Sequence, residues 1–510
     1  MTAVTRRGFN ALAMGTAMLP MVGPAFGQAA ARGKSIIVAQ SSDAYTMDPA
    51  KHSNFQTANI LGHLYDSLVH LNLDGTFGPR LALSWSNPDP MTWRFVLRQG
   101  VKFHNGEEFN AEAVKFTFDR ALDPKFAAPY RSRIAAITKV EVVDPFTVDF
   151  KTAAPFPTML YSLYTASFAS LIVPPKYAAE SNGEAIAKKA VGTGPFRLVE
   201  WVKDDRVVVE ANPDYWGGKP KLDKITFRPI KERRTAIAEI KSEGVDLISD
   251  VPPEDVPGLN RGETKTIVQD SDFFFFFFAF DTLKATPLQD KRVRQAINYA
   301  VDVDTIQKTI LGGMGKRIAV TLPTSALGYD PDLKPYPYDP AKAKALLAEA
   351  GFPNGFEIPL TSRQFYYLKD KEIMEATMGY LARVGIKVNP NFLEPGVWAQ
   401  VSEKKGREGL IYPGWSGNDP DLIWYPILTT GMYQSYFSNK ELDELLVKGR
   451  STLDLNERKA IYKKAGQLIK EEAPHLPLFQ APSIYAVNKR LVWKPRSDTL
   501  LDLREAEVAG

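Results

Sequence analysis

The chain has 510 residues, too many for a single hydrophobic core, so two or three domains are expected. Its 63 basic and 59 acidic residues are dispersed, which excludes the concentrated basic surface of a nucleic-acid-binding protein. The lack of cysteine excludes disulfides, a thiol nucleophile and cysteine-based metal sites.

The first residues predict export from the cytoplasm. Thr5-Arg6-Arg7-Gly8-Phe9 is a twin-arginine segment, and an apolar run over residues 11–22 follows it. This run is too short for a membrane-spanning helix, which needs about 20 apolar residues. We expect residues 1–27 to be a cleaved twin-arginine-type signal peptide, with cleavage after Gly27 or, alternatively, Ala30 or Ala31. An uncleaved anchor is the alternative, and the mature protein is expected to be soluble and periplasmic.

Further along the chain, residues 35–40 and 93–98 have strand patterns, and residues 136–151 contain two alternating strands around Asp144-Pro145. Asn110 is expected to cap the start of a helix.

Residues 273–280 contain seven phenylalanines and one alanine. Side chains of a strand alternate between two faces, so this strand is apolar on both and must be covered on both. We expect it to lie inside a sheet and to carry the chain from a first lobe to a second. A core strand of a single domain is the alternative.

Beyond this strand the pattern changes to alternating helix and strand. Asp339 and Pro340 are typical of the cap and first residue of a helix. Residues 357–360 and 386–392 have strand patterns, and residues 370–384 between them have a helical one. A strand-helix-strand unit requires parallel pairing, so the predicted fold class is α/β.

Most of the known enzyme motifs can be excluded from this sequence. The five histidines are scattered without metal-ligand spacing, so no metal site is expected. Gly414-Trp415-Ser416-Gly417-Asn418 comes near a nucleophile elbow, but its fifth residue is not glycine. We therefore expect no catalytic residues, no cofactor and no enzymatic activity.

Binding residues are expected where strands end, because ligands of open α/β sheets lie at the carboxyl ends of strands. Arg363 can hold a carboxylate through two hydrogen bonds, Asp419 or Asp421 can pair with an amine, and aromatic residues supply rigid walls. This set suits a zwitterionic solute, although each residue taken singly is also compatible with a solvated loop or ordinary packing. The candidate ligand-binding residues are Tyr45, Thr46, Arg363, Tyr366, Trp415, Ser416, Asn418 and Asp419.

Several motifs, in this order, resemble those of family 5 bacterial extracellular solute-binding proteins, the peptide- and nickel-type receptors of ABC importers. They are Trp93-x-Phe95-x-Leu97-Arg98-x-Gly100-Val101-x-Phe103-x-Asn105-Gly106, Gly192-Thr193-Gly194-Pro195-Phe196, Asn212-Pro213-Asp214-Tyr215-Trp216, Arg292-Val293-Arg294-Gln295-Ala296-Ile297 and Tyr338-Asp339-Pro340-x-Lys342-Ala343.

The resemblance implies a two-lobed periplasmic binding protein (Venus-flytrap) fold that closes over its ligand and docks on ABC permease subunits in the inner membrane. Lobe I would span residues 28–270 with an extra subdomain at about 60–185. Lobe II would span 271–480, and residues 481–510 would return to lobe I. Dipeptide receptors of the family hold the ligand carboxylate with an arginine that corresponds to Arg363. Their amine-binding aspartate corresponds to Asn418 here, with Asp419 one residue later.

The function expected from the residues and the resemblance is capture of a small peptide-like or zwitterionic solute in an interlobe cleft for a membrane permease. A modified peptide, an opine, a glutathione-like compound and another organic acid all fit as ligand. A secreted hydrolase and a periplasmic sensor or chaperone are the alternatives, and the protein is expected to be a monomer.

Overall fold

A computed structural model describes residues 33–165, 170–363, 367, 369–412, 414–432 and 434–509. Residues 33–510 form one compact unit. The expected signal peptide, residues 1–27, lies outside the described residues, and so does the candidate site residue Tyr366.

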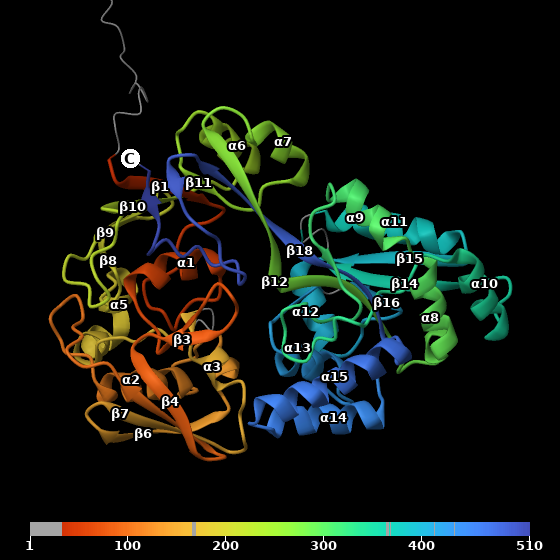
Figure 1. Ribbon diagram of the computed structural model, residues 1–510, viewed down its shortest axis with the longest axis horizontal. Coiled ribbons are helices and arrows are strands. Elements are labelled where there is room, and N and C mark those ends of the chain that lie inside the picture. Colours follow the sequence, from red (N-terminus) through yellow and green to blue (C-terminus); the bar gives the residue numbers. More distant parts are fainter. Residues whose placement is uncertain are drawn as a thin grey trace, which may run out of the picture. The chain divides into compact units, whose positions relative to one another are not determined.

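A sheet of twelve strands runs through the compact unit, and helices flank it (Figure 1). Ten strands follow one another in the order β15 (Ile386–Leu393), β14 (Phe356–Arg363), β16 (Leu410–Tyr412), β12 (Thr264–Phe280), β18 (His475–Asn488), β11 (Leu247–Ile248), β1 (Ser35–Gln40), β10 (Lys224–Pro229), β9 (Arg206–Ala211) and β8 (Phe196–Val202). Two short strands pair beside this path: β13 (Lys316–Arg317) with β18, and β17 (Trp415–Ser416) with β12. This combination of a large sheet and flanking helices confirms the predicted α/β class.

The phenylalanine-rich segment forms the C-terminal part of β12, in the interior of the sheet as predicted. Its side chains alternate between two cores: Phe276 and Phe278 pack on one face, Phe275 and Phe277 on the other. The strand begins earlier than the phenylalanines, because residues 264–270 pair with the far end of β18 before the register shifts between Asp270 and Phe275. Figure 1 shows β12 and β18 running together between the two halves of the sheet.

Helices cover both faces of the half that contains β14, β15 and β16. The face of Phe276 is covered by α8 (Lys291–Ala300), α9 (Val303–Ile310), α10 (Pro340–Glu349) and α11 (Asp370–Ala382). The face of Phe275 is covered by α13 (Pro420–Leu428), α14 (Lys440–Ser451) and α15 (Leu455–Glu472). Helix α12 (Pro395–Glu403) follows β15, and Asp339 caps α10 as predicted, accepting a bond of 2.9 Å from the Lys342 amide.

The predicted strand-helix-strand unit is confirmed as β14-α11-β15, with parallel pairing over the full length of both strands. Strand β14 is longer than predicted: it continues from Leu360 to Arg363, because these residues pair with β15 on one side and Leu360 to Ser362 pair with β16 on the other. Arg363 therefore ends a strand in the sheet interior rather than lying in a loop.

The half that contains β1 has a second pair of cores. Helix α1 (Phe55–Leu64) and the C-terminal residues 491–506 cover one face of it, and α6 (Arg233–Lys241) and α7 (Val256–Leu259) the other. The C-terminal segment carries a small hairpin, β19 (Leu491–Val492) with β20 (Glu507–Val508).

A separate four-stranded sheet lies within the range proposed for the extra subdomain. Its order is β4 (Ala82–Asp89), β5 (Thr92–Leu97), β7 (Thr147–Thr152) and β6 (Ile137–Asp144), with α2 (Ala111–Leu122) packed on it. Asn110 caps α2, as predicted. The neighbouring short elements are β2 (Val69–Leu71), β3 (Phe77–Pro79), α3 (Met159–Ser162), α4 (Pro175–Ala179) and α5 (Glu184–Lys188).

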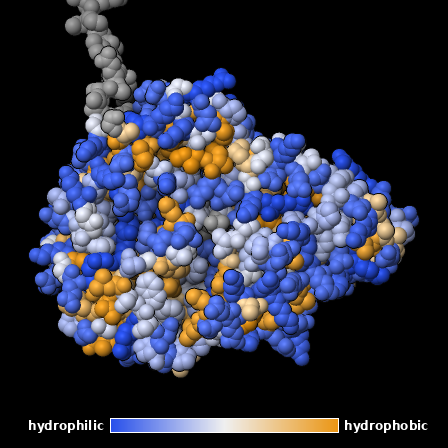
Figure 2. Space-filling model, viewed as in Figure 1, coloured by the Kyte–Doolittle hydropathy of each residue, from blue (hydrophilic) through white to orange (hydrophobic). Residues whose placement is uncertain are grey.

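Within the described residues, none of the helices has both the length and the apolar character required to cross a bilayer. Figure 2 shows a mainly hydrophilic visible face on which hydrophobic residues gather in separate small patches.

Candidate functional site

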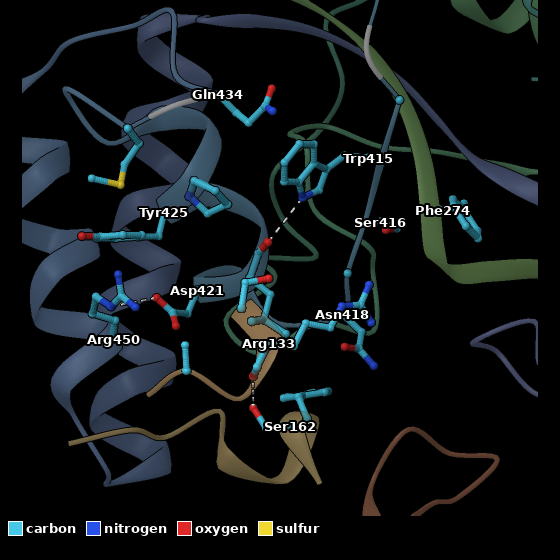
Figure 3. A pocket seen from close by; sticks show the side chains of 18 of the residues that line it. Arg133, Ser162, Phe274, Trp415, Ser416, Asn418, Asp421, Tyr425, Gln434 and Arg450 are labelled. Atoms are coloured by element: carbon cyan, nitrogen blue, oxygen red, sulfur yellow. Dashed lines mark hydrogen bonds and ion pairs between the residues drawn. The ribbon is translucent and has the colours of Figure 1, made fainter. Parts of the chain in front are cut away.

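A cavity of about 970 Å³ lies between two groups of segments. One group comes from residues 132–164, beside the four-stranded sheet, and the other from residues 363–450 together with Phe274 of β12. Figure 3 shows side chains of both groups, including Arg133 and Ser162 from the first and Asn418, Asp421 and Arg450 from the second. The second group is built on the end of β14, on β17 and on α12, α13 and α14.

Arg363 lines this cavity from the end of β14. Its Nη2 donates to the hydroxyl of Tyr367, and its guanidinium lies 5.0 Å from the centre of the Tyr367 ring and 5.6 Å from that of Trp398. Because the strand is paired on both sides, the backbone that carries Arg363 has a defined position. A guanidinium carries five N–H donors in a planar fork, which is the geometry that matches a carboxylate.

Trp415 and Ser416, two of the candidate ligand-binding residues, also line the cavity. They form β17, which pairs with Phe275 and Phe274 of β12, and the indole nitrogen of Trp415 donates to the Leu422 carbonyl at 3.3 Å. Before them, Gly414 has φ of 56°, and a Cβ there would lie 2.6 Å from the Tyr367 ring. Glycine is therefore required where the Trp415 loop packs on the residue that contacts Arg363.

Asp419 and Asp421 differ in their surroundings. Asp419 caps α13 and is 2 % exposed, and its carboxylate accepts two bonds from Arg458, at 2.6 and 2.7 Å. It does not line the cavity, contrary to its inclusion among the candidate ligand residues, because this pair with α15 occupies both of its oxygens. Asp421 lines the cavity instead.

Asp421 is 5 % exposed, and its Oδ1 lies 3.5 Å from Nε of Arg450. Burial raises the pKa of Asp421 to about 6, against the opposing effect of Arg450. Figure 3 shows the two side chains beside each other, with the Tyr425 ring next to the Arg450 guanidinium. That ring centre is 3.7 Å from the guanidinium carbon, a cation–π contact.

Asn418 lines the cavity as expected, and its Oδ1 has no hydrogen-bond partner among the described residues. Tyr45 and Thr46 do not line it. Tyr45 is 65 % exposed, and the Thr46 hydroxyl donates to the Ala187 carbonyl at 3.4 Å and accepts from the Asp48 amide at 3.1 Å. Thr46 therefore holds its own loop against α5.

Three arginines of the cavity were missed from the sequence: Arg133, Arg407 and Arg450. Arg407 is 2 % exposed and donates to the Tyr436 hydroxyl at 3.0 Å and to Oε1 of Gln434 at 2.6 Å. None of the three belongs to a motif or follows a recognisable strand, so no sequence signal connects them. They come together only when helices and loops far apart in the chain pack around one cavity.

Among the described residues, no cluster of three or more histidine or acidic side chains has the geometry of a metal site. The cavity instead combines guanidinium groups, one carboxylate, neutral hydrogen-bonding groups and aromatic walls. This is the chemistry of a binding site for a small polar solute.

Comparison with known proteins defines the class. The profile of the bacterial extracellular solute-binding proteins, family 5, matches residues 76–436. The chain belongs to this family, and it is a periplasmic solute-binding receptor of an ABC importer with the two-lobed fold of such receptors.

Individual relatives cover nearly the whole chain. The glutathione-binding protein GsiB of Escherichia coli K12 is 30% identical over 503 residues, 96% of each chain. The periplasmic binding protein DppA of Helicobacter pylori, solved with the peptide STSA, is 27% identical with a TM-score of 0.75, over 93% of this chain and 98% of that one. AgaA of A. tumefaciens R10, solved with agropinic acid, is 28% identical with a TM-score of 0.74, over 93% and 99%.

Proposed function

We propose that this receptor captures a small peptide-like solute that carries at least two carboxylates and one amine. One observation carries the proposal: the described lining of the cavity includes four arginines, Arg133, Arg363, Arg407 and Arg450, and a single carboxylate, Asp421. A cavity with this excess of guanidinium groups favours a ligand of net negative charge.

Each part of such a solute has a matching group. Arg363 binds one carboxylate through paired hydrogen bonds, and Asp421 pairs with the amine in place of the aspartate that Asn418 replaces. Trp415 and Tyr425 form rigid walls against the apolar parts, and Ser416 offers a hydroxyl. A volume of about 970 Å³ is large enough for a tripeptide with bound water.

Two relatives support this ligand class. GsiB is named for glutathione, which at neutral pH carries two carboxylates and one amine, and AgaA was solved with an opine acid. Both are negatively charged solutes related to amino acids.

The test combines mass spectrometry and calorimetry. Ligand released by denaturing freshly purified protein is identified by mass, and titrations compare glutathione with its diethyl ester, in which both carboxylates are masked. We expect micromolar affinity for the anionic solute, about 8 kcal/mol, and a loss of at least about 100-fold for the ester. Equal binding of acid and ester, or a preference for neutral dipeptides, would contradict the proposal. Cleavage of the added peptide would instead favour the hydrolase alternative.

We further infer that residues 1–27 direct export through the twin-arginine route and that the mature receptor is a monomer. The lobes are proposed at residues 28–270 and 271–480, with residues 481–510 returning to the first. Replacing Arg6 and Arg7 by lysine should leave the precursor in the cytoplasm, as judged by cell fractionation. Unchanged periplasmic yield would mean that another export route is used.

A further inference from the structure

A second cavity, of about 570 Å³, lies among residues 70–80, 195–221 and 492–506. It shares no lining residue with the arginine-rich cavity. The β2–β3 hairpin, the loop between β9 and β10 and the C-terminal segment form its walls. The solute-binding function described above does not use these residues.

Arg80 and its partners form one part of the floor. Nε of Arg80 donates to Asp66 at 2.7 Å, and Nη2 donates to the Tyr215 hydroxyl at 3.1 Å. Asp66 also accepts from the indole nitrogen of Trp216 at 3.0 Å. Asp66 is fully buried behind the cavity, so it compensates Arg80 without presenting negative charge to a ligand.

Arg496 and Arg504 form the other part of the floor. Arg496 makes a paired contact with buried Asp498, at 2.6 and 3.0 Å. Arg504 is 8 % exposed; its Nη2 donates to the Gly62 carbonyl, and Nη1 lies 3.6 Å from Oδ2 of Asp502. Neither Nε nor Nη1 of Arg504 has a hydrogen-bond partner among the described residues. A buried guanidinium with two unused donors is costly unless an acceptor comes to it.

The rim adds charge and apolar surface. Lys219, Lys221 and Lys494 are exposed there, against one exposed carboxylate, Glu505. Lys221 also pairs outside the cavity with Glu507, at 2.7 Å. The apolar lining residues at the rim are Leu73, which is 57 % exposed, and Val492, which is 46 % exposed, and the rings of Trp216 and Trp493 lie beside them in the lining.

His70 also lines this cavity, and its pKa reflects its surroundings. Burial, and then the positive charge of Arg80, lower the pKa of His70 to about 3, so this lining residue is neutral at physiological pH. Burial and Arg80 also lower the pKa of Arg504. Burial is the largest cause of both shifts, whereas the carboxylates of Asp66, Asp498 and Asp502 raise the pKa values of Arg80 and Arg496.

We propose that this second cavity is a ligand site of its own, which binds a small organic anion with an aromatic or aliphatic body. The anionic group, a carboxylate or phosphate, contacts the Arg504 guanidinium and the Lys494 ammonium. The apolar body lies against Trp216, Leu73 and Val492. The site is separate from the solute cavity, so both can be occupied together.

The experiment uses the mature protein labelled with 5-fluorotryptophan and titrated with phenyl phosphate, followed by fluorine NMR. Of the eight tryptophan signals, those of Trp216, Trp493 and Trp415 are assigned with single Trp→Phe variants. Phenyl phosphate should shift the signals of Trp216 and Trp493, whether or not the signal of Trp415 in the arginine-rich solute cavity shifts as well. Benzyl alcohol, which lacks the charge, and inorganic phosphate, which lacks the apolar body, should each shift them at least about fivefold less at equal concentration.

Charge reversal at the rim completes the test without disturbing the buried floor. Lys494→Glu should weaken phenyl phosphate binding about fivefold or more, whereas Lys203→Glu, the same change of charge on an exposed lysine of the β8–β9 turn, should leave it within twofold. Shifts confined to Trp415, no shift at all, or equal effects of the two variants would overturn the proposal.

Discussion

Asp419 and Asp421 are two residues apart at the start of α13, yet one is bound to Arg458 and the other lines the solute cavity. Both fit an acidic helix start, so the sequence supports either as the amine partner. The choice depends on where α15 places Arg458, 39 residues away. The carboxylate that lacks this partner is the one left for a ligand.

The first prediction for a single residue concerns Arg363. Arg363→Ala should weaken binding of a carboxylate ligand by at least about 30-fold, because it removes a charge-assisted hydrogen-bond pair from the cavity. Calorimetric titration measures the change, with thermal unfolding of the unliganded variant as a check that the fold is kept. Arg383→Ala, which removes an exposed arginine stacked on Tyr380, should leave affinity unchanged. Equal affinities of the Arg363 variant and the parent would exclude Arg363 from the site.

Asp421 gives a prediction for the pH dependence of stability. Its folded pKa of about 6 lies above the unfolded value of 3.8. Protonation therefore favours folding, and this contribution is complete below pH 3.8 and lost as the pH rises through 6. At pH 7.5 the charged carboxylate destabilises the unliganded protein by about 2–3 kcal/mol. Asp421→Asn should raise the thermal midpoint at pH 7.5, and the gain should decline as the pH falls towards 4.

Ligand affinity should depend on the protonation of Asp421 in the opposite direction from stability. If Asp421 pairs with the amine, affinity of the parent protein falls as the pH drops below 6, because protonation removes the charge, and the Asn variant binds weakly at every pH. Titrations at pH 5, 6 and 7.5 measure this. A parent affinity that stays level from pH 7.5 to 5 would mean that the amine has another partner.

At the scale of elements, β12 connects the two halves of the sheet and takes part in two cores. Its alternating phenylalanines were sufficient to predict a strand covered on both faces. The first nine residues of β12, residues 264–272, were not predicted, because their mainly polar and charged side chains lack strand alternation; residues 264–270 become a strand by pairing with β18. The same holds for the last three residues of β14, whose extension fixes Arg363.

Because β12 is buried on both faces, shortening a side chain at its centre should destabilise the protein. Phe277→Ala should lower the free energy of unfolding by about 3–5 kcal/mol, since the ring is 1 % exposed and packs under α13, α14 and α15. Denaturant unfolding monitored by circular dichroism measures the loss. Val268→Ala on the same strand, where the side chain is 41 % exposed, should cost less than about 1 kcal/mol. Similar losses for both would mean that the Phe275 face is not a tightly packed core.

Across the whole molecule, an ion pair joins parts of the two halves of the sheet that are 115 residues apart in sequence. Nζ of Lys369, just before α11, lies 2.8 Å from Oε1 of Glu254, which follows β11. Lys369 is also six residues beyond Arg363. We propose that this contact stabilises the closed arrangement in an open–closed equilibrium between the two halves.

Lys369→Ala should therefore weaken ligand binding by up to about fivefold, mainly through faster dissociation, because a partly exposed ion pair contributes about 0–1 kcal/mol. Stopped-flow measurements of release test this, and the difference should shrink at high salt. Lys387→Ala is the matched control, since its 2.7 Å pair with Glu357 lies between neighbouring strands of one half. A control variant that releases ligand as fast as Lys369→Ala would show that the pair has no role in closure.

The sequence by itself determined the features that depend on near neighbours along the chain: the caps of α2 and α10, the two-faced strand, the β14-α11-β15 unit and the motifs of the family. The tertiary structure decided which carboxylate lines the cavity, and it brought Arg133, Arg407 and Arg450 to the cavity of Arg363. The physical reason is the range of the interactions. Alternation and capping act over two to four residues, whereas the lining of a cavity is set by the packing of segments that are up to 318 residues apart.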